Sequence, residues 1–382
     1  MSIADRNYIE RVFLGFESPA LERAATILVD RYRRKHLLDM REAIVVMPGR
    51  RASRRLREIL AERAADAQLM LALPEFRTIG TLPEELYAAE RQFASELVQQ
   101  LVWAQVLREA DNVYRSAVVP LPPSDDDSSA SAWLDLGDVL RRYQFELAAD
   151  GLTFADVERL GQEMDDFTEL PRWAALARLQ QDYFQLLTKL QLEDVQHARL
   201  QAIARRKCCT DAHLVLVGIA DISTALRQML SCVAEKGTTQ VTALIFAPDS
   251  WADRFDRFGG LLTEIWQKLP IDLDEEQLEM VEGPDEQCGA VLQRLASWSG
   301  DLRPDEIAVG MPDERLVSRL QRYLDQADVS SRWATGRQLN ETGPCRLFAA
   351  VAGFVQGGRH EDLAALLRHP DLFAWLERRF RG

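Results

Sequence analysis

Lysine is scarce in this chain of 382 residues. Of its 46 basic residues only five are lysines, at positions 35, 189, 207, 236 and 268. None follows a glycine, so the Gly-Lys pair with which a standard phosphate-binding loop reaches terminal phosphates is absent. None has an acidic residue two positions earlier, which excludes the acid-x-lysine element that restriction-type nucleases use to hold a metal ion and orient water. We therefore expect neither ATP hydrolysis through a standard loop nor nuclease chemistry of that type.

The chain also lacks long apolar runs, a basic net charge and paired cysteine motifs. No run approaches the ~18 residues of a membrane span, and charged residues interrupt any signal-peptide core in the first thirty positions. The formal net charge of −14 argues against a uniformly basic surface but leaves room for a local basic track. The five cysteines show neither C-x-x-C nor Cys/His spacing, which indicates reduced thiols and no metal site. These features predict a soluble, cytoplasmic protein of two or three domains with no membrane partner.

Short apolar runs alternate with helical patterns in the N-terminal part. Apolar, β-branched residues at 12–14 and 43–47 predict buried parallel strands, followed by helices over about 19–34 and 50–65. Residues 76–82 are typical of a strand end and turn, and runs at 213–217 and 241–246 predict further strands. The order β-α-β-α predicts an α/β fold with a doubly wound parallel sheet.

Helical periodicity interrupts this pattern, and a second α/β pattern follows it. The segment 120–131 is rich in proline, serine and aspartate and predicts a surface loop. A strand at 307–311 is expected before a helix at 313–327, and the chain ends in helical segments at 343–356 and 360–380. We therefore predict a discontinuous first domain (1–82 and 200–272), a helical insertion (83–199) and a partial second domain (273–382).

The loop after the first strand, in "VFLGFESPALER", has the outline of a phosphate-binding loop. Counted from Gly15, the second glycine position holds Ala20, the lysine position Leu21 and the hydroxyl position Glu22. The pattern alone favours an ordinary strand-to-helix turn, because single glycines are common in such turns.

Arginines are concentrated at the start of the helix predicted over 50–65. They occupy the first two turns, where the helix dipole disfavours cations, and are Arg50, Arg51, Arg54, Arg55 and Arg57. Two interpretations stay open: ion pairs with acidic neighbours such as Glu58 and Glu62, or contacts to DNA phosphates. Trp251, Phe255 and Phe258 have helical spacing, which favours core packing over a base-stacking platform. His213, at the start of a strand, is expected to be structural.

The ordered series of segments resembles the UvrD-like superfamily 1 helicases. "FLGFESPALERA" resembles their phosphate loop, "AIVVMPGRRASRRLREIL" a motif that contacts single-stranded DNA, and "HLVLVGIADISTALRQML" the strand that ends in an Asp-Glu pair. "DEIAVGMPDERLVSRLQRYLDQADVSSRWATGRQL" resembles the opening of the second motor domain. Within this superfamily the chain is similar to the N-terminal half of the AddB/RexB-type subunit of bacterial helicase-nucleases. The resemblance implies a RecA-like (P-loop NTPase) sheet with an inserted helical lobe and the start of a second RecA-like domain.

The residues that carry the chemistry in these helicase motifs are replaced by others in this sequence. Leu21 and Glu22 replace lysine and hydroxyl, Gly218 and Ile219 stand where the resemblance places Asp-Glu, and Pro312 stands where it places a γ-phosphate arginine. The resemblance thus implies a module of DNA double-strand break repair without catalytic residues, metal or cofactor. It would contact single-stranded DNA through the five arginines and support an AddA-type helicase-nuclease subunit. The family's nuclease domain, with its iron–sulfur cluster, would lie beyond this chain.

Two other functions remain open from the sequence. The first is a scaffold that only docks its partner, without DNA or nucleotide binding. The second is an enzyme that uses nucleotide through nonstandard residues.

Overall fold

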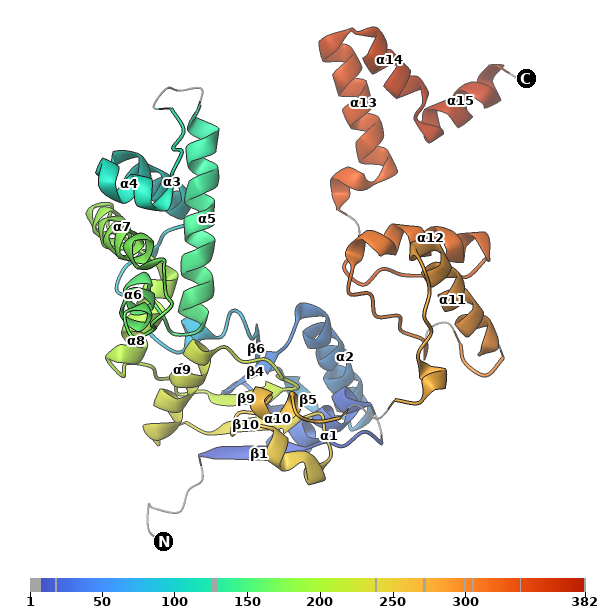
Figure 1. The fold of residues 1–382 in the computed structure, drawn as a ribbon. Coiled ribbons are helices and arrows are strands. Elements are labelled where there is room, and N and C mark those ends of the chain that lie inside the picture. Colours follow the sequence, from blue (N-terminus) through green and yellow to red (C-terminus); the bar gives the residue numbers. More distant parts are fainter. Residues whose placement is uncertain are drawn as a thin grey trace. The chain divides into compact units, whose positions relative to one another are not determined.

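The computed structural model describes residues 8–17, 19–124, 129–237, 239–270, 273–298, 300–303, 306–336 and 338–380. The chain divides into a first unit that extends to Leu269 and a second unit that begins at Pro270 (Figure 1).

A five-stranded parallel sheet forms the centre of the first unit. Its strands, in spatial order, are β1 (Ile9–Phe13), β10 (Val241–Ile245), β9 (His213–Val217), β4 (Ala43–Met47) and β6 (Glu75–Thr78). β4 and β10 are buried at every position, which accounts for the apolar sequence of β4 and for the single polar residue of β10, Thr242. The strands predicted at 12–14, 43–47, 213–217 and 241–246 are confirmed, and the chain is an α/β protein with a mostly parallel central sheet.

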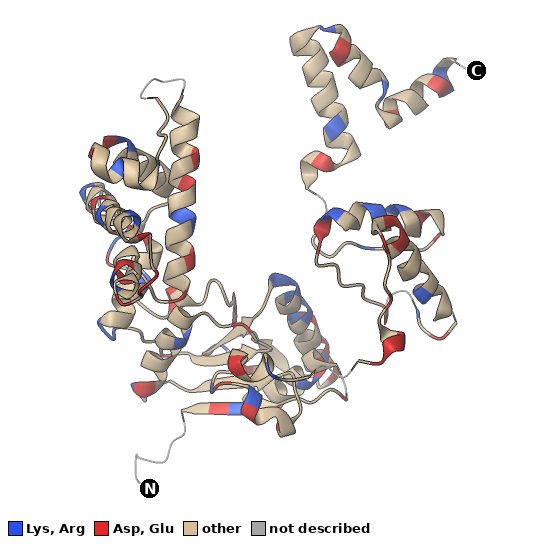
Figure 2. Ribbon diagram, viewed as in Figure 1, with Lys and Arg blue, Asp and Glu red and all other residues tan. Residues whose placement is uncertain are grey.

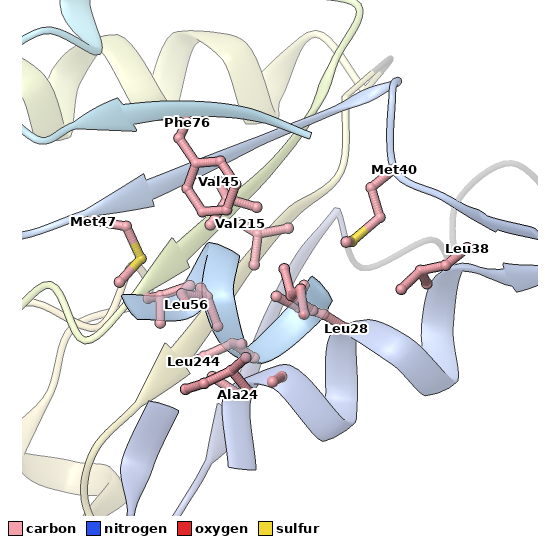
Figure 3. Packing of buried hydrophobic residues seen from close by; sticks show 14 of the residues in the cluster. Ala24, Leu28, Leu38, Met40, Val45, Met47, Leu56, Phe76, Val215 and Leu244 are labelled. Atoms are coloured by element: carbon pink, nitrogen blue, oxygen red, sulfur yellow. The ribbon is translucent and has the colours of Figure 1, made fainter. Parts of the chain in front are cut away.

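Helices cover both faces of this sheet. The covering elements are α1 (Ala20–Tyr32), α2 (Arg50–Asp66) and α9 (Thr224–Glu235). On the face of α1 and α2, Leu28 and Leu56 lie against Val45 in one buried cluster (Figure 3). On the opposite face, Met229 of α9 packs with Leu216. Burial on both faces explains why the strands are rich in Val, Ile and Leu rather than alternating.

The chain reverses its direction across the sheet between β4 and β9. From β4 it passes through α2 to β6 on one side, and from β9 through α9 to β10 on the other. In open α/β sheets, ligands bind beyond the carboxyl ends of the strands at such a switch point. The turn before α2 and the loop after β9 flank this position.

A small second sheet follows α1. Its order is β2 (Arg33–Arg34), β3 (Leu37–Asp39) and β5 (Met70–Ala72). Lys35 has a φ of 54° and turns the chain from β2 into antiparallel β3. The helix predicted over 19–34 therefore ends at Tyr32.

Between β6 and β9 the described residues form six α-helices. They are α3 (Glu96–Glu109), α4 (Asn112–Val118), α5 (Ala130–Ala149), α6 (Phe154–Gly161), α7 (Leu170–Lys189) and α8 (Val195–Ala204). Trp103 stacks on Tyr183 in their core, with ring centroids 4.3 Å apart. The parallel pair β7 (Gln92–Phe93) and β8 (Leu192–Glu193) joins the two ends of this helical segment. Of the loop predicted over 120–131, residues 125–128 lie outside the described part.

Shorter elements complete the first unit. These are the 3-10 helices η2 (Pro83–Glu85) and η4 (Asp249–Arg254) and the short helix α10 (Thr263–Trp266). They lie in connections next to the main sheet rather than in its two helical layers.

The named elements of the second unit, among its described residues, are all helices. Its α-helices are α11 (Pro284–Ser297), α12 (Val317–Gln326), α13 (Gly343–Gly357), α14 (His360–Leu367) and α15 (Pro370–Phe380), with 3-10 helices η5 (Glu275–Gln277), η7 (Glu314–Leu316) and η8 (Leu339–Glu341). Cys288, Leu320 and Leu324 form its buried cluster. The helical segment predicted over 360–380 is interrupted before Pro370, which has no N–H to continue the hydrogen-bond ladder.

The strand predicted at 307–311 is wrong. These residues adopt no regular structure, and Val309 is 45% exposed. A strand needs a neighbour for its N–H and C=O groups, and the described residues of the second unit contain no other strand to supply one. An apolar run without such a neighbour stays irregular.

Candidate functional site

The expected nucleotide and DNA positions of the first unit lie at one edge of the main sheet. Gly15 follows β1, Gly218 and Ile219 follow β9, and the arginines begin α2 directly after β4 and its turn. Because these strands are parallel, their carboxyl ends meet at the same edge. Pro312 belongs to the second unit, where it lines a cavity of about 60 Å³ beside Met311.

In the Gly15 loop, the backbone N–H group that a phosphate would need as a donor already bonds to the protein, and a carboxylate lies beside it. The Gly15 N–H donates to the carbonyl of Ala247 at 2.9 Å. The carboxylate of Glu17 lies directly beside the Gly15 Cα and accepts a hydrogen bond from Arg23 at 2.9 Å. A carboxylate held at this place disfavours an anionic ligand. Gly15 itself is required because its φ is +66°.

Glu22 joins the first two helices by an ion pair. It lies in the first turn of α1, and its carboxylate accepts from Arg63 of α2 at 2.9 Å. Its negative charge also suits the positive end of the α1 dipole. Beside it, Leu21 packs against the sheet core, and Ala20 begins the helix. These residues therefore connect α1 to its neighbours rather than face a nucleotide.

The positions expected to hold an Asp-Glu pair are apolar and tightly packed. The Gly218 N–H donates to the carbonyl of Leu244 at 2.9 Å, with a Gly218 φ of +61°. A Cβ at Gly218 would lie 2.5 Å from the ring of Phe246. Ile219 is 4% exposed and packs in the cluster beneath α9. Neither residue supplies an oxygen ligand from its side chain.

The five arginines in the first turns of α2 separate into paired and unpaired ones. Arg55 contacts Glu58 at 3.3 Å and Glu62 at 3.7 Å, and Arg57 lies over the ring of Phe76 at 4.5 Å from its centroid. The ion-pair interpretation thus applies to Arg55. The remaining three, Arg50, Arg51 and Arg54, are exposed and have no side-chain partner among the described residues. Figure 2 shows basic residues gathered over the first turns of α2.

The N-terminus of α2 is open to an acceptor. Gly49 occupies the N-cap and supplies no side-chain cap, and the first turn contains no acidic residue. The hydroxyl of Ser53 donates back to the Gly49 carbonyl at 3.3 Å and so does not cap the N–H groups. Three unpaired cations at the positive end of a helix repel that end and one another. An anion at this position would satisfy both the cations and the backbone donors.

The aromatic residues of the segment 251–258 contribute to the core. Phe255 and Phe258 are 8% and 2% exposed, so core packing is confirmed for both. They do not share a helix face, because η4 ends at Arg254 and Phe255 is extended. Trp251 is half-buried and packs edge-to-face on Trp266, with ring centroids 5.7 Å apart.

Sequence spacing indicates some of the contacts that the α2 arginines make, but not all of them. Glu58 follows Arg55 by three positions, a visible helical neighbour. Phe76 beneath Arg57 comes from β6 and has no local signal.

Comparisons with known proteins leave the family open. A scan against protein-family models finds no match, and a search of the curated proteins finds no significantly similar one. Within the described ranges, no group of three His, Cys, Asp or Glu residues is placed to hold a metal ion. No helix in the same ranges has the length and apolar character to cross a bilayer.

Proposed function

We propose that this chain is a non-catalytic, helicase-like module that binds single-stranded DNA at the N-terminus of α2. The observation that carries the proposal is the set of three exposed, unpaired arginines at an uncapped helix N-terminus. This set lies beside the switch point between β4 and β9, where open α/β sheets bind ligands. Arginine and backbone N–H groups at such a place bind phosphates and position a strand without reading its bases.

The wider identity belongs to the same proposal. The proposal is supported by the parallel central sheet, the helical segment between β6 and β9, and the apolar or ion-paired residues at the expected nucleotide positions, as the inactive helicase part of an AddB/RexB-type subunit would have them. In that role the chain would guide DNA for an AddA-type helicase-nuclease partner in double-strand break repair. Glu22 and Ile219 support the non-catalytic part, because each has a structural contact where catalysis needs a free group.

The test is binding of a fluorescent single-stranded oligonucleotide over a series of salt concentrations. Replacing Arg50, Arg51 and Arg54 together by glutamine should weaken binding about equally for all sequences. The log–log salt slope should become shallower by about 2, since each lost contact to a single strand removes about 0.7. The melting temperature should not fall, because unpaired cations at a helix N-terminus do not stabilise the helix.

Two controls match this variant. Arg33→Gln, Arg34→Gln and Lys35→Gln together remove the same charge from β2 and its turn, beyond the opposite end of α1, and should leave the slope unchanged. Arg55→Gln removes a paired arginine from α2 itself and should change binding little. If the triple variant of α2 binds DNA with unchanged affinity and slope, the DNA function is refuted. The scaffold function would then be favoured, most directly if the unmodified protein binds no DNA at low salt.

A further inference from the structure

A second candidate site lies at the base of the helical segment, away from the arginines of α2. A cavity of about 270 Å³ is lined by α7, α8 and the chain that leaves the sheet at residues 87–91. It thus lies where the two connections between the sheet and the helical segment run together, beside the β7–β8 pair. The ion pair of Arg199 with Glu84, at 2.6 Å, joins the same two connections.

Two stacked aromatic rings line one side of the cavity. The rings of Phe184 and His197 stack with centroids 4.0 Å apart and an interplanar angle of 27°. Burial lowers the pKa of His197, so the imidazole is neutral at neutral pH. The amide nitrogen of Gln201 lies 2.9 Å from its Nε2 and holds the ring in place. Leu187 and Ala202 add buried apolar surface. The outer face or the edge of such a stacked pair is a surface on which a planar ring packs.

The cavity is lined by three cations, Arg91, Arg205 and Lys207, and by three carboxylates, Glu90, Glu193 and Asp194. Arg205 and Lys207 both contact Oε1 of Glu90, at 3.3 and 3.2 Å. The hydrogen bond from Lys207 lowers the pKa of Glu90, which therefore remains an anion. Glu193 accepts from the backbone N–H of Arg91 at 3.2 Å. The guanidinium of Arg91 is exposed and makes no side-chain hydrogen bond or close ion pair among the described residues, although its charge acts on nearby Glu90.

We infer that this cavity binds a small planar aromatic or heteroaromatic molecule that carries an anionic group. The ring would lie along the Phe184–His197 wall, and the carboxylate or phosphate would pair with the Arg91 guanidinium at the rim. Because the ligand would contact both connections to the helical segment, binding should stabilise their junction. The inference does not depend on DNA binding by α2.

The test uses calorimetric titration of the intact protein with 5′-AMP and with anthranilate, which carry the two kinds of anion. At least one should bind and raise the melting temperature. Three control compounds each lack one half of the ligand. Adenosine and inorganic phosphate should each bind about tenfold or more weakly than 5′-AMP, because the first lacks the anion and the second the ring. Aniline lacks the anion and should bind about tenfold or more weakly than anthranilate. Binding by 5′-AMP alone assigns a nucleotide, and binding by anthranilate alone assigns an aromatic acid. If neither binds at millimolar concentration, the inference is overturned.

Two variants locate the site, because one is expected to weaken ligand binding and the other to strengthen it. Arg91→Gln should weaken binding about tenfold, since a hydrogen bond to a charged group is lost. Glu90→Gln should strengthen it several-fold, because Arg205 and Lys207 lose their competing anion. Arg33→Gln and the glutamine triple variant of α2 are the controls, and both should bind as the unmodified protein does. Unchanged affinity in both Arg91→Gln and Glu90→Gln would place the ligand elsewhere and refute the assignment.

Discussion

At the scale of single residues, charged side chains of the same type have different partners at neighbouring positions of α1 and α2. Glu22 occupies the place of a hydroxyl that would hold a metal ion, yet its carboxylate pairs with Arg63. Arg55 is neutralised by acidic neighbours, whereas Arg54, one position earlier, faces solvent without a partner. The contacts of these side chains, rather than their residue types, separate ion-paired positions from unpaired ones in this region.

Introducing the lysine and hydroxyl of a phosphate-binding loop at positions 21 and 22 should not produce ATP hydrolysis. In Leu21→Lys with Glu22→Thr, the Gly15 loop still holds the Glu17–Arg23 pair, and Ile219 still supplies no metal ligand. The double variant should release no phosphate from Mg-ATP. It should also lose about 1 kcal/mol or more of stability, since an apolar contact and an ion pair are removed.

Phosphate release and denaturant unfolding check this expectation. Glu22→Gln, which keeps Leu21, is the control that separates the ion pair from the apolar contact. Turnover by the unmodified protein would contradict the non-catalytic function, and unchanged stability of the double variant would contradict the roles given to Leu21 and Glu22.

At the scale of elements, a polar network ties α1 to three strands near their amino ends. Thr242 of β10 is fully buried, and its hydroxyl donates to Glu10 of β1 at 3.0 Å. His213 of β9 lies with Nε2 3.0 Å from the same hydroxyl, and the Tyr32 hydroxyl contacts its Nδ1. Because Thr242 donates to Glu10, it accepts from Nε2–H. Burial lowers the pKa of His213, so the ring is neutral and its Nδ1 accepts from Tyr32. His213 thus has a structural role.

This network predicts a loss of stability in mild acid. Burial, reinforced by the nearby Arg31 charge, lowers the pKa of His213 to about 4, against about 6.5 when unfolded. The unfolded chain therefore takes up a proton first as the pH falls from about 6.5 towards 4, and folding stability falls over that window. Between pH 7 and pH 5 the contribution is about 1–2 kcal/mol.

Urea unfolding at several pH values measures the effect. His213→Gln should lower stability at pH 7 and make its pH dependence shallower by about that amount. His36→Gln removes an exposed histidine and is the control. If His213→Gln keeps the full pH dependence, the neutral assignment of His213 is wrong.

At the scale of the whole molecule, the sheet is assembled from two distant stretches of chain. β1 pairs with β10, so that Ile9 lies opposite Val241 and Phe13 opposite Ile245. The helices α3–α8 lie in the chain between β6 and β9. The two sheet-forming stretches are thus held together by strand pairing and by the core, independent of an intact chain between them.

Limited proteolysis tests this arrangement. The first cut should fall within 120–131, because its composition favours an exposed loop. The nicked protein should elute as one species in size-exclusion chromatography, since β1 and β10 remain paired. Mass spectrometry of the fractions identifies the cut. Elution of residues 1–80 as a separate folded piece would contradict the insertion topology.

The sequence by itself determined the central strands of this protein. Residues 43–47 and, apart from Thr242, residues 241–245 are apolar and largely β-branched because a parallel strand between two helical layers is buried on both faces. The helix limits near Arg50 and Asp66 follow equally from local signals, a preceding Pro-Gly turn and an apolar period of 3.6. The absence of a Gly-Lys pair also follows from the sequence alone, because none of the five lysines comes after a glycine.

Only the tertiary structure decided which arginines are free and which segments become strands. Arg57 contacts Phe76, and Arg63 contacts Glu22, partners 19 and 41 positions away along the chain. Residues 307–311 have a strand-like composition but no strand beside them in the part of the second unit that the structure describes, whereas β2 is only two residues long and forms because β3 pairs with it. Local pattern fixes what a segment prefers, but a strand or an ion pair also needs a partner that only the folded chain brings into reach.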